Sequence, residues 1–366
     1  MDASHHARKL LLAGGLVVGL ACTRSAPATP PAAAPSAPPA AAAERPESAP
    51  SATAPPALTP LVIVYGTTSA ANTFLQVAQD QGLYEANGLA VELSYAVGNA
   101  APAAVLSGQA QAMVTGCIEA VSASVGSGGD VALLMQPVHR MQYLLASGAD
   151  VATPSDLRGK RLAVSRIGSS SHLISRTIVR FVGLDPDTDV SFVQVGNTPE
   201  RVAALLAGNI DATVLSLDEG ALLATNPGMH VLVDMTREPV PYCTNSVGAS
   251  RQILGAQADT VRRLTRALVA ALARFRLDKP AGLEATRRFL GEDDPGKVES
   301  IWTAWESVYE RKPYPDNAGL QRVIDDAAES DARLASVKAE QINDPRWVAE
   351  LDQSGYLDQF YSGSGQ

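Results

Sequence analysis

The sequence has few cysteines, few aromatic residues and a deficit of positive charge, and each shortage excludes a class of protein. Three cysteines among 366 residues are too few for a disulfide-rich scaffold. Lys and Arg total 29 against 38 Asp and Glu, so the formal charge is −9, whereas a nucleic-acid-binding surface needs positive charge. No apolar run reaches the ~20 residues of a membrane-spanning helix. With 5% aromatic residues, the chain is a poor candidate for a wide stacking pocket.

Sequence patterns that carry common enzyme chemistry are also missing. No Walker, G-x-S-x-G or G-x-G-x-x-G motif stands at a strand–helix junction. His139, His172 and His230 have no metal-ligand spacing. We therefore expect no metal, no cofactor and no catalytic residue, although Cys117 with a distant histidine stays open as an enzymatic alternative.

The N-terminus has the pattern of an export signal. A polar, basic start precedes Leu10–Leu20, an unbroken run of Leu, Ala, Gly and Val that is long enough for a signal core and too short for a bilayer. Ala21 and Cys22 follow, so this end resembles a bacterial lipoprotein signal, although Gly19 stands where such signals usually have Leu. We predict a signal over residues 1–22 with lipidation at Cys22. Ordinary secretion with cleavage nearby is the alternative.

The next stretch has the composition of a linker. Residues 23–60 contain 14 Ala and 11 Pro and show no apolar periodicity. Because proline removes backbone hydrogen-bond donors, we expect a disordered, extended tether. An anchor followed by a tether favours a periplasmic or cell-surface location, held at a membrane through Cys22.

The remainder of the chain alternates predicted strands and helices. Short apolar runs bounded by turn residues indicate strands, and apolar residues three or four apart indicate helices. This alternation predicts an α/β fold with mainly parallel sheets, followed by a helical C-terminal extension without a chemical motif. The predicted strands are 61–65, 90–95, 112–115, 131–135, 142–147, 161–165, 190–195, 212–215 and 231–234; the predicted helices are 73–85, 100–107, 118–127, 171–182, 200–207, 218–224, 259–277, 281–290, 298–310 and 320–339.

An internal repeat indicates two similar units. Residues 105–115 (VLSGQAQAMVT) align with residues 205–215 (LLAGNIDATVL) at an offset of 100, and two shorter matches have offsets of 98 and 101. That period is far too long for a solenoid array. Two facing α/β units would form a cleft lined by the loops after the strand carboxyl ends. These loops are 66–72, 98–100 and 115–119 in the first unit, and 165–172, 196–198 and 216–219 in the second.

Two segments carry a family resemblance. Residues 156–171 (DLRGKRLAVSRIGSSS) and 203–214 (AALLAGNIDATV) resemble motifs of ABC-transporter substrate-binding proteins of the nitrate, sulfonate, taurine and thiamine-precursor type. The resemblance covers roughly residues 61–310. It implies a periplasmic-binding-protein-like (type II) fold, in which two α/β lobes joined by two crossing segments close on a ligand. One lobe would comprise residues 61–140 plus 246–366, and the other residues 141–245.

The predicted loops supply the candidate ligand contacts. Free N–H groups and hydroxyls at the start of the helix near Ser169–Ser171 favour an anion, with Arg166 as a partner, although plain capping and a solvated arginine explain them equally. Asp218 is expected either to interact favourably with the dipole of the helix that it begins or to pair with a ligand amine. The second role would suit a zwitterionic ligand. The full candidate set is Thr67, Thr68, Ser69, Asn72, Asn99, Thr115, Cys117, Arg166, Ser169, Ser170, Ser171, Asn197, Ser216, Asp218 and Tyr242.

Structural roles compete with ligand contact at several of these positions. Turn chemistry accounts for the polar residues of 67–72, and hinge packing accounts for Tyr242. A lone cysteine such as Cys117 is usually a buried small side chain. Because Cys117 and Cys243 lie in different predicted segments, we do not expect a disulfide between them.

The resemblance implies a function. The chain would be the extracytoplasmic component of an ABC importer, a monomer that captures a small anionic or zwitterionic organic solute and delivers it to permease and ATPase subunits. We do not expect it to be an enzyme or to bind nucleic acid. A receptor for a membrane sensor and an enzyme on the same two-lobed fold are the alternatives.

Overall fold

The computed structural model describes residues 57–96, 99–220, 223 and 227–362. The predicted signal, Cys22 and most of the tether therefore lie outside the described residues, as do Val97 and Gly98, the latter in the predicted loop 98–100. The first strand begins at Thr59, inside the stretch that the sequence assigned to the tether.

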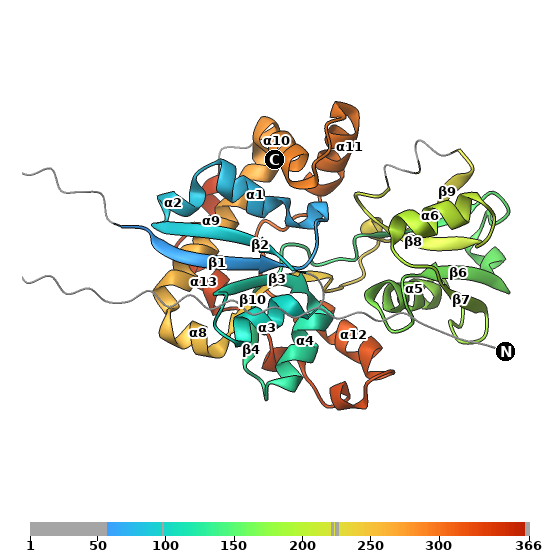
Figure 1. Ribbon diagram of the computed structural model, residues 1–366, viewed down its shortest axis with the longest axis horizontal. Helices are drawn as coiled ribbons and strands as arrows, with labels where there is room; N and C mark the ends of the chain where they lie inside the picture. The colour runs from blue at the N-terminus through green and yellow to red at the C-terminus, as the bar shows by residue number, and fades with distance from the viewer. Residues whose placement is uncertain (1–56, 97–98, 221–222, 224–226, 363–366) are drawn as a thin grey trace, which may run out of the picture. The chain divides into compact units, whose positions relative to one another are not determined.

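Two five-stranded sheets carry the fold (Figure 1). The first sheet has the order β2-β1-β3-β10-β4 and the second has the order β7-β6-β8-β5-β9. The strands are β1 (Thr59–Tyr65), β2 (Leu89–Tyr95), β3 (Ala112–Gly116), β4 (Val131–Met135), β5 (Tyr143–Gly148), β6 (Lys160–Val164), β7 (Val190–Gln194), β8 (Ala212–Ser216), β9 (Met229–Asp234) and β10 (Asn245–Ser250).

Each sheet contains one reversed strand. β10 pairs antiparallel with β3 and β4, and β5 pairs antiparallel with β8 and β9, while the other neighbours are parallel. The expectation of mainly parallel sheets is confirmed for four strands of each sheet. Each reversed strand follows directly after a segment that crosses between the sheets: β5 comes after β4 of the first sheet, and β10 comes after β9 of the second.

The 100-residue repeat corresponds to matching places in the two sheets. β3 and β8 are both central, and both lie between a parallel strand and the reversed strand. In each, four successive residues are buried and the last is half-buried. A strand that is covered on both faces has a continuous apolar sequence. This shared requirement explains why these two segments kept the clearest sequence similarity.

β10 was not predicted, because its sequence (NSVGAS) lacks the usual strand signal. All six of its residues are nevertheless buried. Gly248 permits the tight approach to β4, since a Cβ there would lie 3.0 Å from the carbonyl oxygen of Ala132. Small residues are therefore selected here by packing between β3 and β4 rather than by strand propensity.

Most helices follow the predicted periodicity, but those at 251–256 and 346–353 were not predicted, the predicted helix 298–310 ends at Glu306, and three further predicted segments differ from the structure. The segment 73–85 divides into two helices at Gly82, whose φ of 62° is left-handed. The segment 320–339 is helical only to Ala328. Residues 218–220 of the predicted helix 218–224 form turns, and most of its remainder lies outside the described residues. The helices are α1 (Thr73–Asp80), α2 (Leu83–Ala86), α3 (Ala100–Leu106), α4 (Cys117–Gly126), α5 (Ser170–Phe181), α6 (Thr198–Leu206), α8 (Arg251–Ala256), α9 (Ala258–Leu277), α10 (Lys279–Leu290), α11 (Pro295–Glu306), α12 (Asn317–Ala328) and α13 (Arg346–Gln353).

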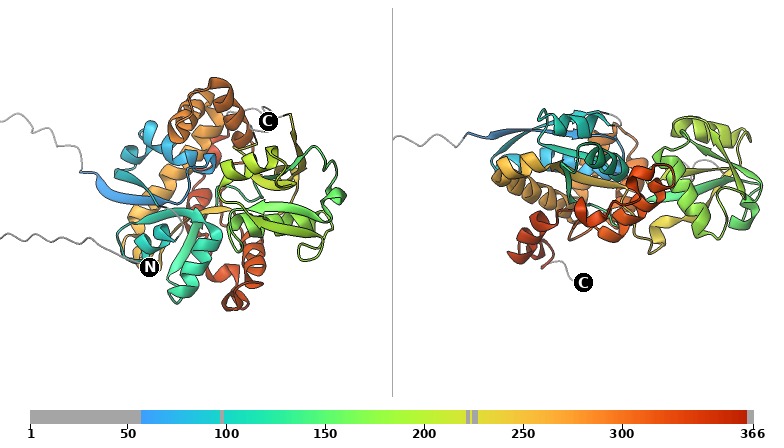
Figure 2. Two further views of the ribbon diagram at one scale, coloured as in Figure 1. Left: turned by 45° about the vertical axis from the view of Figure 1, so that its right-hand side comes forward. Right: turned by 90° about the horizontal axis from the view of Figure 1, so that it is seen from below.

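The C-terminal helices pack mainly around the first sheet, as Figure 2 shows for the orange and red segments. α9 buries twelve of its residues, and its Phe275 meets Tyr309 edge to face at 5.0 Å between ring centroids. The Tyr309 hydroxyl donates to the carbonyl oxygen of Ala70 at 2.8 Å. This apolar support fixes the loop after β1. No helix in the described part of the chain is long and apolar enough to span a membrane.

α12 differs from the other C-terminal helices because it also contacts the second α/β unit. Asp326 on α12 accepts a hydrogen bond from the Thr177 hydroxyl of α5 at 2.6 Å. Glu329 accepts from Arg176 at 3.0 Å and from Arg180 at 2.7 Å. The C-terminal segment thus links the elements of the two sheets at one side of the site.

Candidate ligand-binding site

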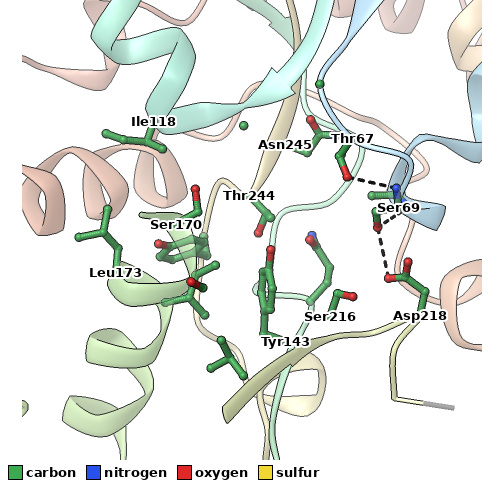
Figure 3. Close-up of a pocket in the computed structure, with 18 of the residues that line it drawn as sticks. Thr67, Ser69, Ile118, Tyr143, Ser170, Leu173, Ser216, Asp218, Thr244 and Asn245 are labelled. Carbon is green, nitrogen blue, oxygen red and sulfur yellow. Dashed lines mark hydrogen bonds between the residues drawn. The ribbon is translucent and has the colours of Figure 1, made fainter. Parts of the chain in front are cut away.

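A cavity of about 450 Å³ lies where the strand carboxyl ends of the two sheets face each other (Figure 3). Both sheets and both crossing segments contribute to its wall. The lining residues are Gly66, Thr67, Thr68, Ser69, Ala71, Thr115, Gly116, Ile118, Glu119, Gln142, Tyr143, Ser170, Ser171, Leu173, Ile174, Thr198, Arg201, Val214, Ser216, Asp218, Glu219, Tyr242, Cys243, Thr244, Asn245, Trp305 and Val323.

The loop after β1 is held by its own polar side chains. Ser69 caps a short 3-10 helix, Ala70–Asn72, by accepting from the Ala71 amide at 3.3 Å. Its own amide donates to the Thr67 hydroxyl at 3.1 Å. Thr67, Thr68 and Ser69 line the cavity. This loop is therefore rigid and presents hydroxyl groups to the cavity.

A chain of amide groups fixes the orientation of Asn245. The Asn72 Nδ2 donates to the carbonyl oxygen of Thr67 at 2.9 Å, so Asn72 presents its Oδ1 to Asn245. The Asn245 Nδ2 donates to that oxygen at 2.5 Å. Asn245 is 8% exposed, and its Oδ1 has no hydrogen-bond partner. The side chain therefore offers a fixed acceptor at the cavity wall, and Asn72 acts behind the wall as the residue that positions it.

Glu119 lies in the first turn of α4, directly after β3. Its Oε1 accepts from the Ser170 hydroxyl at 3.5 Å, across from the second sheet, while its Oε2 is buried without a partner. A Cβ at Gly116 would collide with the Oε2 of Glu119, so a larger residue there would displace this carboxylate. Burial raises the pKa of Glu119, and the hydrogen bonds from its own backbone amide and from Ser170 lower it less.

Asp218 and Glu219 occupy the corresponding place after β8. Glu219 accepts from the Ser216 amide at 2.8 Å. Asp218 reaches the first sheet's loop, where it accepts from the Ser69 hydroxyl and the Ala70 amide, each at 3.2 Å (Figure 3). Burial raises the pKa of Asp218, and the Glu219 charge raises it further. Glu119 and Glu219 are separated by the repeat offset of 100 residues, so the repeat brings two carboxylates to one cavity.

Arg201 is the cavity's positively charged residue. It is 5% exposed. It donates to the Thr213 and Thr198 hydroxyls and to the carbonyl oxygens of Gly196 and Val214, at 3.0 to 3.2 Å. Burial lowers its pKa. These bonds direct the guanidinium toward its own sheet. Sequence reasoning missed Arg201, although its position four residues before the apolar Leu205 on α6 was a signal that it faces inward.

Tyrosines from both crossing segments complete the wall. Tyr143 pairs with Ser216 in the register of β5 and β8, and Tyr242 precedes β10 and is 4% exposed. Burial raises the pKa of both phenols, so both are neutral hydroxyls at physiological pH.

Cys117 and Cys243 form a disulfide, so the expectation that they stay unpaired was wrong. Their Cα atoms are 5.7 Å apart although 126 residues separate them. Cys117 begins α4, and Cys243 lies in the segment that returns to the first sheet. The crossing places the two side chains together, which sequence spacing could not show. Because Cys117 is in this bond, it is no free thiol.

The cavity brings together nine of the candidate ligand contacts and leaves six outside its lining. Those in the wall are Thr67, Thr68, Ser69, Thr115, Ser170, Ser171, Ser216, Asp218 and Tyr242. Asn197 instead caps α6, accepting from Glu200, and Ser169 donates to the carbonyl oxygen of Arg166. Arg166 and Asn99 are exposed. Asn72 and Cys117 are buried behind the wall. Ligand contact by the nine stays a prediction.

Sequence reasoning missed several wall residues besides Arg201. Trp305, Asn245 and Tyr143 reach the cavity from the C-terminal region and from the two reversed strands. No motif marks them. Within the described part of the chain, no group of three or more His, Cys, Asp or Glu residues is placed to hold a metal ion.

Replacing Glu119 by Gln is expected to stabilise the solute-free protein by about 1 kcal/mol at pH 7, because it removes a buried carboxylate with an unpartnered oxygen. The pKa of this carboxyl is raised in the folded state above its ordinary 4.5. Between the unfolded pKa and the raised folded pKa, the folded protein retains a proton that the unfolded chain has lost. The stability of the wild type therefore falls as the pH rises from the unfolded pKa through the folded pKa. The gain in the variant is therefore present at pH 7 and absent below pH 4.5.

Thermal melts of Glu119→Gln across this pH range measure the effect. Glu340→Gln is the matched control, because Glu340 is exposed and far from the cavity wall. Equal melting temperatures for wild type and Glu119→Gln at pH 7 would show that burial of Glu119 costs nothing.

Comparison with known proteins identifies similar folds. A family model described as NMT1/THI5 like matches residues 70–281. A putative sulfonate ABC transporter, periplasmic sulfonate-binding protein SsuA, from Methylobacillus flagellatus is similar with a TM-score of 0.67 and 18% identity, over 83% of this chain and 96% of that chain. The periplasmic aliphatic sulphonate binding protein SsuA from Escherichia coli has a TM-score of 0.62 and 19% identity, over 77% of this chain and 91% of that chain.

A third similar structure is the periplasmic nitrate-binding protein NrtA from Synechocystis PCC 6803. Its TM-score is 0.63 at 12% identity, over 81% of this chain and 89% of that chain. At these identities the likeness shows the fold, which is that of the periplasmic binding proteins, as the sequence predicted. Among the curated proteins, none matches this chain.

Proposed function

This chain belongs to the NMT1/THI5-like family, and we propose on that basis that it is the extracytoplasmic solute-binding component of an ABC importer. The observation that carries the proposal is one cavity lined by both sheets and both crossing segments. Similar solved structures are named as binding proteins for sulfonate and for nitrate. The partners would be a small organic solute and the permease and ATPase subunits.

Capture would proceed by closure of the two α/β lobes on the solute. The bonds from Ser69 and Ala70 to Asp218 and from Ser170 to Glu119 join groups that follow strands of different sheets. A solute bound between these groups stabilises the closed state relative to the open one, which is the requirement for ligand-driven closure. The closed form would then dock on the permease.

The cavity is better suited to binding than to catalysis. Among its described lining residues there is no histidine, and Cys243 is held in the disulfide. No nucleophile is therefore paired there with an imidazole base. We propose that the chain is not an enzyme and acts as a monomer.

We further propose that the protein is lipid-anchored at Cys22 and held off the membrane by its Ala/Pro-rich tether. Replacement of Cys22 by Ala should release the protein from the membrane fraction of cells that export it. Retention of the variant in that fraction would contradict the anchor and leave the binding function in place.

Native mass spectrometry of the full-length chain in detergent tests the binding function. We expect one small solute bound to each chain, and a rise in melting temperature with one chemical class in a panel of sulfonates, carboxylates, amines and pyrimidines. The Cys22→Ala variant should bind the same solute, because the described cavity wall is built from residues between Gly66 and Val323. If no solute copurifies and no class in the panel changes the melting temperature, the transport function is contradicted.

A further inference from the structure

The charged side chains of the cavity are mainly acidic. Glu119, Asp218 and Glu219 line it, whereas Arg201 is the single basic residue in its described wall. Arg166, the arginine that the sequence placed beside an anion, is exposed and does not line the cavity. The wall therefore carries a net negative charge when its carboxyl groups are ionised.

The acceptors in this wall are incompletely satisfied. The Oε2 of Glu119 is buried without a hydrogen-bond partner, and so is the Oδ1 of Asn245. Asn72 donates to the carbonyl oxygen of Thr67 and accepts from the Asn245 Nδ2, so the oxygen of the Asn245 amide, and not its nitrogen, is free. An unsatisfied buried acceptor costs free energy that a ligand donor recovers. These two oxygens therefore favour a solute that brings N–H donors, while the Trp305 Nε1 donor of the same wall, also buried without a partner, favours an acceptor such as the anionic end of a zwitterion.

The basic residue of the wall is already engaged. Four of the five N–H donors of Arg201 point to acceptors of its own sheet. A nitrate or an isolated sulfonate would meet this single, occupied guanidinium and three carboxyl groups. Like charges brought together in a buried site repel strongly, so the wall disfavours an anion without a compensating cation.

We propose that the solute carries a protonated nitrogen group, an ammonium or an amidinium, which binds between Glu119 on the first sheet's side and Asp218 with Glu219 on the second sheet's side. The proposal deepens, and rests on, the proposed function that this cavity holds a small organic solute. A cation between carboxylates of opposite sheets attracts both, so its binding energy is gained only in the closed state. The solute is thus an organic cation or a zwitterion bound through its cationic end.

The same groups make binding depend on pH. The charged groups around the cation are Glu119, Asp218, Glu219 and Arg201, and Tyr143 and Tyr242 are the neutral titratable groups beside them. Burial raises the pKa of Glu119 and of Asp218 in the solute-free protein. A bound cation favours their ionised forms, so binding releases protons and affinity falls when the pH is lowered.

Shape-matched probes on the full-length chain test the charge of the solute. Benzamidine, benzamide and benzenesulfonate form one set, and butylamine, butyramide and butanesulfonate form another. We expect the amidine or the amine to raise the melting temperature while its neutral and sulfonate analogues do not. The affinity for the effective probe should fall at least tenfold in Glu119→Gln, remain unchanged in Glu340→Gln, and decrease between pH 7 and pH 5 in the wild type.

The outcomes separate the charge assignment from the proposed function. If a sulfonate or neutral solute binds one-to-one and Glu119→Gln leaves its affinity unchanged, the cation site is wrong and the binding function stands. If no probe binds and native mass spectrometry finds no copurified solute, both are overturned. The accurate mass of a copurified solute, measured after its release from the protein, gives its elemental formula, and a nitrogen-free formula also overturns the cation site.

Discussion

Replacing both Cys117 and Cys243 by Ser is expected to lower the free energy of unfolding by about 4 kcal/mol, because a bond that closes a long loop restricts the unfolded chain most. The two residues are 126 positions apart. The loss should lower the melting temperature by roughly 8 °C. The bond also joins the start of α4, next to Glu119, to the crossing segment that carries Tyr242, so part of the destabilisation will be at the cavity.

Thermal unfolding of the oxidised wild type, the wild type reduced with dithiothreitol, and the double variant measures the contribution. The reduced protein and the variant should melt together, below the oxidised protein. Cys22→Ser is the matched control, since it removes a cysteine outside the disulfide. A reduced wild type that melts with the oxidised one would show that the bond adds no stability.

Asp218→Ala is expected to weaken solute binding by about thirtyfold, through a faster dissociation rate. Its carboxylate accepts from Ser69 and Ala70, which follow a strand of the other sheet. Two hydrogen bonds to a charged acceptor stabilise the closed state, and the cost of desolvating the buried carboxylate offsets part of this gain. The net stabilisation is about 2 kcal/mol. Each 1.4 kcal/mol corresponds to a factor of about ten in affinity.

Stopped-flow binding of the copurified solute measures this effect, and small-angle scattering with saturating solute measures closure. Asp150→Ala is the matched control, because Asp150 is exposed and belongs to the same part of the chain as the second sheet. Asp218→Asn removes the charge of the carboxyl while it retains one of the two acceptor oxygens that hold the loop of Ser69 and Ala70. An unchanged dissociation rate in Asp218→Ala would show that these bonds do not hold the closed state.

The site shows where sequence reasoning reaches its limit. Loops at the ends of parallel strands were predictable, because an apolar run followed by Gly, Ser or Thr marks both a strand and its end. Hence Thr67, Ser69, Ser170 and Asp218 were found. Tyr143 and Asn245 were missed because they begin the reversed strands. An antiparallel strand brings its first residues, and not its last, to the edge where parallel strands end; Tyr143 pairs with Ser216 and Asn245 with Gly116.

Side-chain direction was a second limit. Arg166 and Arg201 are both near cavity loops in sequence, and only the packing of α6 against β8 turns Arg201 inward while Arg166 stays exposed. The position of a loop in the fold determines roughly where each Cα atom lies, but it does not determine the direction in which the side chain points. The charge of the cavity therefore could not be deduced from the residues of its loops.

By itself the sequence determined the class of fold, the order of every strand except β10 and of most helices, and the duplication that sets β3 and β8 in equivalent places, because apolar periodicity and a repeat offset are local properties of the chain. Only the tertiary structure decided which side chains meet. The Cys117–Cys243 bond, the fixed acceptor on Asn245 and the approach of Asp218 to Ser69 all join residues more than 100 positions apart. Such contacts follow from how the chain crosses between the two sheets, and no pattern confined to one segment contains that information.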